Sequence, residues 1–386
     1  MTSDTSFDLD LDLLYLEIEP SLPAQIWQES QFLATPASRW RAYLNQLALQ
    51  TLLPWLSEEA GGRVHPMLKQ ALLPTVWEWV SGTAVDVDDW RLVLLPTEAM
   101  DADELRVPQE WVDIPEWLGD YYLHVQVNPD DGWVKVAGMA THQLLKAQGV
   151  YDWRDRSYAL PTSDLITDVN VMTVSQALMP AVTKRVAVAP IPSLPLARAN
   201  SLIQRLSDLS LRDPRLAIDF SSWSALMVHG GWRRQMAQQR WGRPAAFSVG
   251  QWLQSGVSQL AQALDWQEVT FQPATAGARG DATAPQVGLA RPVQIEGDRY
   301  ILQVSPVEPQ AMNTWRFELR KLDGVVAPGV VLRLLAEDLQ PFENNEAVAT
   351  EPIEALYVEV ALEPGEGIVW EVVPTPDQYE SEILRF

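Results

Sequence analysis

The chain contains no cysteine among its 386 residues. This absence excludes disulfide bonds, thiolate nucleophiles and cysteine-ligated metal sites. Histidine is also scarce, and no two of the four histidines have the spacing of a metal-ligand pair: His65, His124, His142 and His229. We therefore predict neither a metal site nor a cofactor.

Long apolar runs are missing as well. No stretch of 18 apolar residues occurs, so we expect no membrane-spanning segment and no membrane partner. The opening residues MTSDTSFDLDLDLLYL lack both the basic and the unbroken apolar region of a signal peptide. With no cysteine there is also no sign of an oxidising compartment, and we predict a cytoplasmic location.

Catalytic signatures are absent too. The sequence has no glycine-rich nucleotide motif of the GxGxxG or GxxxxGK[ST] type, and neither a GxSxG nor an SxxK motif surrounds a serine that could act as a nucleophile. The pattern therefore predicts no catalytic residue.

Positive charge is scarce: 28 Lys and Arg stand against 51 Asp and Glu, a net charge of −23. Such a balance argues against direct binding to nucleic acid, because phosphate contacts need basic side chains. The exception is residues 183–286, with 11 bases and 6 acids. Ten of these bases lie between Lys184 and Arg243. Either they pair with carboxylates of the flanking segments, or they form an exposed face that binds an anion or a partner protein.

The first 182 residues are predicted to form an α+β domain. Residues 7–13 alternate between apolar and acidic side chains, which predicts a strand with one acidic face. A helix should begin at Thr35-Pro36 and be kinked or ended by Pro54. Residues 121–139 predict a hairpin with a loop at 128–132, and a helix is expected over 163–178.

The rest of the chain divides by composition. Residues 183–271 predict a basic helical segment packed on the first domain, and residues 272–286 have the small polar composition of a linker. Residues 287–386 contain short strands separated by turns, which favours an antiparallel β-sandwich, immunoglobulin-like in outline. Residues 357–360 and 369–372 are expected to be neighbouring strands of it. The predicted fold class is α+β.

Candidate binding residues come from two places. His142 opens a short predicted helix and could act as a general base oriented by Asp164 or Asp168, or could be a structural histidine. The Gly230-Gly231 pair precedes a helix that could bind an anion at its N-terminus, or could be a plain hinge. The candidates are His142, Asp168, Trp232, Arg233, Arg234 and Arg240.

Two further stretches combine charges in ways that allow more than one interpretation. Residues 151–158 alternate aromatic and charged side chains, which is typical of a turn with local ion pairs or of a stacking surface. Residues 337–346 predict an acidic loop that could bind a cation, and we favour a loop that is solvated or docked on the basic segment.

Long strings of this sequence resemble a cyanobacterial family known as domain of unknown function 1822. They include GDYYLHVQVNPDDGWVKVAGMATHQLLKAQGVYDWRDRSYALPTSDLI at 119–166, WRFELRKLDGVVAPGVVLRLLAEDLQPFENNEAVAT at 315–350 and LYVEVALEPGEGIVWEVVPTPDQYESEILRF at 356–386. The resemblance implies a cytosolic cyanobacterial protein, and it brings no established reaction and no catalytic residues.

Two functions follow from these observations. The first is a non-catalytic regulatory or scaffold protein that binds another protein, such as a sigma factor or a signalling protein, since Trp and Arg dominate interface hot spots. The second is an enzyme or small-ligand binder with a site between the N-terminal and helical parts. The sequence identifies neither the partner nor the oligomeric state.

Overall fold

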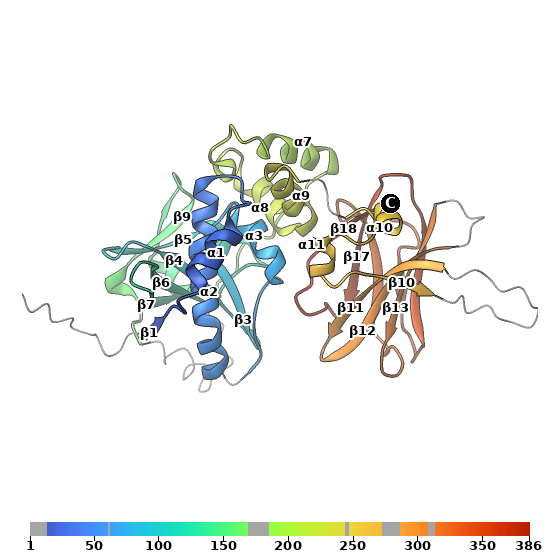
Figure 1. Cartoon of the computed structure of the whole chain (residues 1–386), viewed down its shortest axis with the longest axis horizontal. Helices are drawn as coiled ribbons and strands as arrows, with labels where there is room; N and C mark the ends of the chain where they lie inside the picture. Colours follow the sequence, from blue (N-terminus) through green and yellow to red (C-terminus); the bar gives the residue numbers. More distant parts are fainter. Residues whose placement is uncertain (1–13, 61, 169–184, 244–246, 272–285, 308–312) are drawn as a thin grey trace, which may run out of the picture. The chain divides into compact units, whose positions relative to one another are not determined.

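A computed structural model describes residues 14–386 except 61, 169–184, 244–246, 272–285 and 308–312 (Figure 1). Helices and mainly antiparallel sheets make up an α+β protein. The chain forms two compact units. Unit 1 consists of Met1–Pro192 and Leu209–Val228, and unit 2 of Ser193–Asp208 and His229–Phe386.

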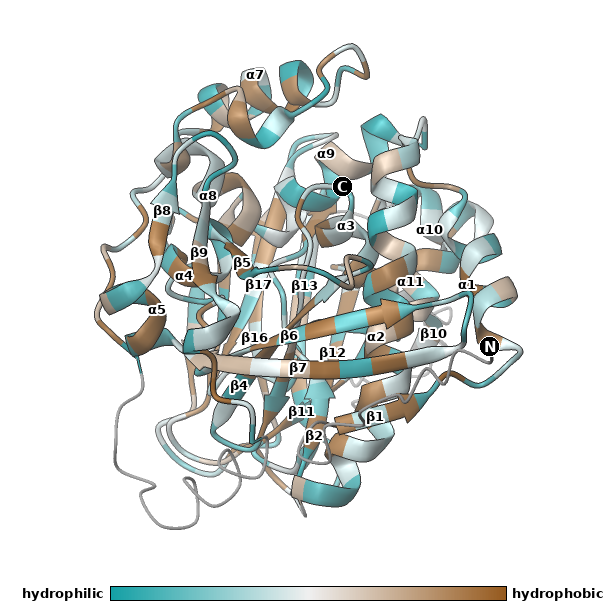
Figure 2. Ribbon diagram, turned by 90° about the vertical axis from the view of Figure 1, so that its left-hand side faces the viewer, coloured by the Kyte–Doolittle hydropathy of each residue, from teal (hydrophilic) through white to brown (hydrophobic). Residues whose placement is uncertain are grey.

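A six-stranded sheet forms the centre of unit 1. Its strands, in spatial order, are β1 (Leu14–Glu17), β7 (Trp133–Thr141), β6 (Tyr121–Asn128), β4 (Trp90–Thr97), β3 (Thr83–Val87) and β2 (Val64–Pro66). All neighbours pair antiparallel except β4 and β6, which are parallel. The predicted hairpin at 121–139 is confirmed as β6 and β7. Figure 2 shows the alternation of apolar and polar residues along β7, as expected of a strand with one buried face.

The long helix α2 (Pro36–Ala60) packs against this sheet, preceded by α1 (Leu22–Ser30) and followed by a 3₁₀ turn (Gln70–Leu72) and α3 (Leu73–Trp77). Thr35 caps α2 as predicted, because its Oγ1 accepts a hydrogen bond from the Ser38 N–H at 3.1 Å. Helix α2 continues past Pro54, so the alternative that this proline ends the helix is wrong, while the predicted kink stays a prediction. Proline removes one N–H donor, and the buried side chains of Leu52 and Leu56 anchor the turns around it to the core.

A small second sheet lies in the same unit, with the order β5 (Glu104–Pro108), β9 (Ser157–Pro161), β8 (Val150–Asp152). Helix α4 (Gln109–Asp113) follows β5 directly. Helix α5 (His142–Gln148) is capped by Thr141 and ends before Gly149, close to the prediction. Unit 1 also contains a 3₁₀ turn at Thr162–Asp164, another at Pro214–Leu216, and α8 (Phe220–Val228). The strand predicted over 7–13 and most of the helix predicted over 163–178 lie outside the described residues.

Unit 2 combines helices with two antiparallel sheets. The helices are α7 (Leu196–Leu206), α9 (Gly230–Arg240), α10 (Val249–Ser255) and α11 (Gln259–Ala263). The five-stranded sheet runs β10 (Gln267–Phe271), β11 (Gln286–Ile295), β12 (Asp298–Pro306), β13 (Thr314–Lys321), β16 (Ala355–Ala361). The four-stranded sheet runs β15 (Glu346–Val348), β14 (Val331–Ala336), β17 (Gly367–Val373), β18 (Ile383–Arg385).

Strands β16 and β17 belong to different sheets, which corrects the expectation that residues 357–360 and 369–372 pair. β16 pairs with β13, and β17 pairs with β14 and β18. The connection between them carries the chain from one sheet to the other. A turn composition at 363–367 is compatible with either route, because pairing is decided by distant strands.

The predicted helical segment 183–271 is divided between the two units, and its last residues form β10 in the five-stranded sheet. The predicted linker falls almost wholly on residues outside the described part. Tryptophan supplies the largest core side chains of both units: Trp77, Trp111 and Trp223 in unit 1, and Trp266 and Trp370 in unit 2. Among the described residues, no helix has the length and hydropathy to cross a membrane.

Candidate functional site

A cleft in unit 1 has a volume of about 710 Å³. It is lined by the end of β4, by His124 in the middle of β6 and by residues of the small sheet β5–β9, and the 3₁₀ turn at 214–216 contributes to one wall. Its polar lining consists of Ser81, Thr97, Asp103, Glu104, Arg106, His124, Asp155, Ser157 and Arg215. A volume in this range is typical of pockets for small organic molecules.

His124 is the buried polar group of this cleft. Along β6, Tyr122, His124 and Gln126 share one face, while Leu123 and Val125 share the other. A β-bulge interrupts the pairing with β7 directly after His124, and bulges redirect side chains beside functional sites. The His124 side chain is 2 % exposed, and its Nδ1 has no hydrogen-bond partner in the described part of the chain. Burial lowers the pKa of His124, so the ring is neutral at pH 7.

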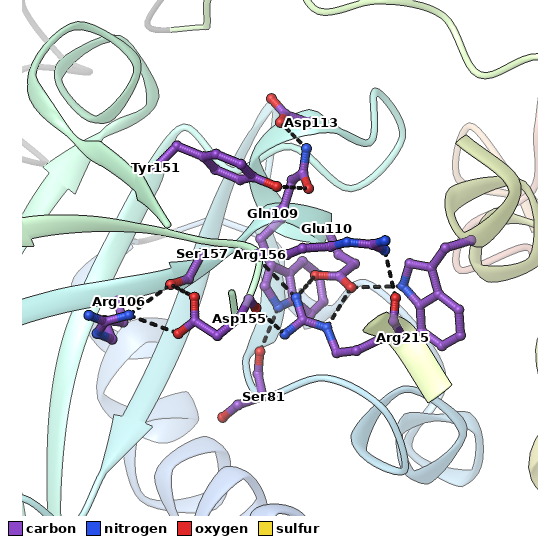
Figure 3. A network of polar contacts seen from close by, with 12 residues as sticks. Ser81, Arg106, Gln109, Glu110, Asp113, Tyr151, Asp155, Arg156, Ser157 and Arg215 are labelled. Carbon is purple, nitrogen blue, oxygen red and sulfur yellow. Dashed lines mark hydrogen bonds and ion pairs between the residues drawn. The ribbon is translucent and has the colours of Figure 1, made fainter. Parts of the chain in front are cut away.

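Arg106 joins the two acidic residues at the rim. Its Nε lies 2.6 Å from Glu104 Oε1 and its Nη1 lies 2.8 Å from Asp155 Oδ2. The Ser157 hydroxyl donates to Asp155 Oδ1 at 2.7 Å. Figure 3 shows Arg106, Asp155 and Ser157 of this cluster, the last of which begins β9. Asp152 and Asp155 of the turn at 151–158 form ion pairs, but their partner is Arg106 of β5, whereas the sequence predicts pairs within the turn.

The side chain of Arg215, on one wall of the cleft, is fixed by hydrogen bonds to the buried carboxylate of Glu110. Glu110 is fully buried in α4, and Arg215 donates to both of its oxygens, at 2.9 and 2.6 Å. Trp223 Nε1 donates to the same carboxylate at 2.7 Å. Arg215 also donates to the main-chain oxygens of Asp155 and Arg156, and Arg156 Nη1 returns a bond of 2.6 Å to the Arg215 oxygen. Figure 3 shows these side chains converging from three segments.

This arrangement is suited to binding. The Ser157 hydroxyl is held by a carboxylate, and His124 makes no hydrogen bond to any described hydroxyl, so no described serine is paired with a histidine base. Within the described residues, no group of three or more His, Asp or Glu side chains is placed to hold a metal ion. The cleft offers hydrogen bonds and charge to a ligand.

The structure places the predicted candidate His142 elsewhere in unit 1. Its side chain is fully buried. Nδ1 accepts a hydrogen bond from the Val186 N–H at 2.9 Å, and Nε2 lies 2.9 Å from the Val112 oxygen, to which it donates. Burial lowers the pKa of His142. Asp168 is exposed and bonds to neither ring nitrogen, since both are taken by main-chain groups.

The other four candidates lie on α9 in unit 2, and all are buried: Trp232, Arg233, Arg234 and Arg240. Burial lowers the pKa of Arg233 to about 9 and that of Arg234 to about 10, so both stay charged at neutral pH.

Each of these side chains has partners within unit 2. Arg233 pairs with Glu380, and Arg234 Nη1 lies 3.9 Å from Glu382 Oε1. Arg240 donates to the main-chain oxygens of Leu206 and Asp208, and Trp232 stacks on His229. These basic residues therefore bond within the interior of unit 2, whereas His142 belongs to unit 1.

The cleft residues Asp103, Glu104, Arg106 and His124 were not among the sequence candidates. One signal could have indicated His124: a polar face on a strand whose other face is entirely apolar. Nothing local in the sequence connects β5 with the turn before β9, because Arg106 and Asp155 meet only through strand pairing.

A family model described as "Protein of unknown function (DUF1822)" matches residues 16–385. The chain belongs to this family. Its description assigns no activity, so the cleft takes no function from it. No curated protein and no solved structure matches the chain.

Proposed function

We propose that this DUF1822 protein is a binding protein that holds a small polar molecule in the cleft of unit 1. The observation that carries the proposal is His124: a buried imidazole with an unpartnered nitrogen on the wall of a cleft of about 710 Å³. A buried polar side chain without a partner costs about 1–3 kcal/mol, and a ligand that bonds to the part of the ring lining the cleft recovers part of this cost.

The supporting chemistry surrounds that ring. A neutral imidazole offers one donor and one acceptor, and the rim adds carboxylate, guanidinium and hydroxyl groups from Glu104, Arg106 and Ser157. This is the second of the two functions weighed from the sequence. Its site lies between strands of the N-terminal part and Arg215 of the predicted helical part, both within unit 1.

The test fills the cleft without removing a hydrogen-bonding group. Ala102 lines the cleft, and Ala102→Trp should block it, whereas Ala37→Trp places the same side chain at an exposed position of α2. A library of small polar molecules is screened by thermal shift. We expect at least one compound that raises the melting temperature of the wild type and of Ala37→Trp but not of Ala102→Trp. A library without any such compound contradicts the proposal.

A second candidate is the regulatory or scaffold role through another protein, with a sigma factor or signalling protein as the partner. It is supported by the strongly exposed Trp153 and the partly exposed Trp27 and Trp40 on unit 1, because exposed tryptophans are typical interface anchors. A photo-crosslinking amino acid at position 153 or 40 tests it in living cells. No heteromeric adduct at either position would count against this candidate.

Finer features of the sequence prediction remain proposals. We propose that the two sheets of unit 2 pack as a sandwich, supported by the buried apolar faces of β13 and β17. Immunoglobulin-like connectivity, a cyanobacterial source and a cytoplasmic location stay predictions.

A further inference from the structure

The charges around the cleft do not balance. Three carboxylates line it, those of Asp103, Glu104 and Asp155, against the guanidinium groups of Arg106 and Arg215. Arg215 is already neutralised by the bidentate contact to Glu110, which is buried behind the wall. Counting Glu110, four carboxylates face two guanidinium groups, so the site carries an excess of two negative charges.

Both arginines of the cleft, Arg106 and Arg215, are paired with carboxylates, whereas the carboxylate of Asp103 has no cationic partner among the described residues. Arg106 is held between Glu104 and Asp155 at 2.6 and 2.8 Å. By contrast, the Asp103 side chain makes no hydrogen bond or ion pair within the described part of the chain. Only its main-chain oxygen is used, as acceptor for Thr162. An anionic ligand would have to displace a carboxylate from an arginine, whereas a cationic ligand finds Asp103 available.

His124 adds a hydrogen-bonding requirement that is independent of the charge count. Its neutral ring lines the same cleft and makes no hydrogen bond to a described side chain, although Nδ1 itself is sealed from solvent, so the ligand meets the rest of the ring. A ligand that reaches it must therefore present a polar N–H or O–H group, or an acceptor, close to the apolar wall formed by Leu95 and Leu105.

We infer that the cleft binds a small organic molecule carrying a protonated amine, which pairs with Asp103 while a second polar group of the molecule bonds to His124. This inference rests on the proposed ligand-binding function and specifies the chemical class of the ligand. No metal is required, and Arg106 keeps its carboxylate partners when the ligand binds.

The experiment uses two sets of three probes that share a skeleton and differ in charge. The first set is 1,4-diaminobutane, 1,4-butanediol and succinate, and the second is glucosamine, glucose and glucuronate. Binding to the full chain is measured by isothermal titration calorimetry at low salt. In at least one set, we expect the amine to bind at least tenfold more tightly than its neutral and acidic analogues.

Variants assign the effect to the cleft. Asp103→Asn should weaken amine binding at least tenfold and reduce its dependence on salt. Asp101→Asn is the matched control, because Asp101 is exposed, carries the same charge and does not line the cleft. His124→Leu should weaken the binding of the amine probe, because the second polar group of the probe loses its partner. Equal losses in Asp103→Asn and Asp101→Asn would mean that the amine responds only to the overall negative charge, and would overturn the inference.

The remaining outcomes separate this inference from the proposed function. If succinate or glucuronate binds best and Ala102→Trp abolishes that binding, the ligand class is wrong and the binding function stands. If a neutral analogue equals its amine, or none of the six probes binds at millimolar concentration, the inference is overturned. The library screen with Ala102→Trp then decides the binding function separately.

Discussion

Several charged side chains of this protein are buried with specific partners. Glu110 is fully buried and depends on Arg215 for its counter-charge, and Trp223 completes its hydrogen bonding. His229 is 2 % exposed and is held by main-chain groups on both ring nitrogens. In such surroundings the loss of one partner leaves a charge or a dipole that water cannot reach.

The pair of Glu110 and Arg215 gives a prediction for stability. Arg215→Ala leaves the Glu110 carboxylate buried without its cation, which should lower the free energy of unfolding by about 3–5 kcal/mol. Urea denaturation followed by tryptophan fluorescence measures the loss. Arg154→Ala, on the exposed part of the neighbouring turn, should change stability by less than about 0.5 kcal/mol. Equal losses in the two variants would show that the pair does not anchor the segment 209–228.

His229 gives a prediction for the pH dependence of stability. Burial lowers its pKa to about 4, against about 6.5 in an unfolded chain. The unfolded state therefore binds the proton first, so the stability that comes from the neutral ring is complete above about pH 6.5 and is lost as the pH falls toward 4. The reason is local: Nδ1 accepts from the Trp232 N–H, and a protonated ring cannot.

The shift corresponds to roughly 3 kcal/mol between these pH values. Denaturation of the wild type and of His229→Asn at several pH values measures it, since asparagine can also cap α9 without titrating. The variant should show a flatter dependence between pH 4 and 6.5. Parallel curves would contradict the assignment to His229.

At the scale of whole elements, α9 and the C-terminal segment around β18 are built against each other. Gly230 and Gly231 open α9 where that segment crosses, and the Gly230 N–H donates to the Ser381 hydroxyl at 3.0 Å. A side chain at position 230 would lie within 2.1 Å of Glu380 Cγ. These glycines therefore permit a close approach of two elements.

Two glycine substitutions distinguish the effect of this close approach on stability from the effect of helix propensity. Gly230→Ala must displace the buried Glu380 and with it the partner of Arg233, so we expect a loss of several kcal/mol or a failure of unit 2 to fold. Gly250→Ala in α10 meets open space and should be neutral or stabilising by up to about 1 kcal/mol. Thermal unfolding by circular dichroism compares them. A Gly230→Ala protein as stable as Gly250→Ala would contradict the packing argument.

Elements formed by neighbouring residues were predictable, and pairings between distant residues were not. The β6–β7 hairpin follows from two apolar runs around Asn128–Gly132, and the start of α2 follows from Thr35 and Pro36. The assignment of β16 and β17 to different sheets depends on β13 and β14, which no local pattern identifies. The cleft has the same origin, because its lining comes from β4, β5, β6, β9 and the 3₁₀ turn at Pro214–Leu216, which no local pattern connects.

For the whole molecule, the position of the basic residues determines what the surface presents. Arg233, Arg234, Arg240 and Arg291 are buried in unit 2, so the net charge of −23 lies on a surface with fewer cations than the composition suggests. The sequence left open whether the bases of 183–271 are exposed or docked. Arg233, Arg234 and Arg240 of that segment are buried with partners inside unit 2. Others are exposed: Arg198, Arg205, Arg212 and Arg243.

The charge predicts a salt effect. Repulsion among surface carboxylates destabilises the folded chain, and salt screens it, while the buried pairs are screened much less. The melting temperature should therefore rise by a few degrees when sodium chloride is raised from about 20 to about 200 mM at pH 7. Differential scanning fluorimetry measures this. A fall in melting temperature would mean that exposed ion pairs, such as Arg299 with Asp323, outweigh the repulsion.

The chain passes between the two units three times, after Pro192, Asp208 and Val228. No single truncation of the chain can therefore yield either unit complete without part of the other. A chain that ends at residue 271, for example, loses every sheet of unit 2 but keeps its helices α7, α9, α10 and α11. During synthesis, α7 emerges before unit 1 has received the segment that carries Arg215. The residues that complete the cleft are therefore synthesised only after part of the other unit has been made.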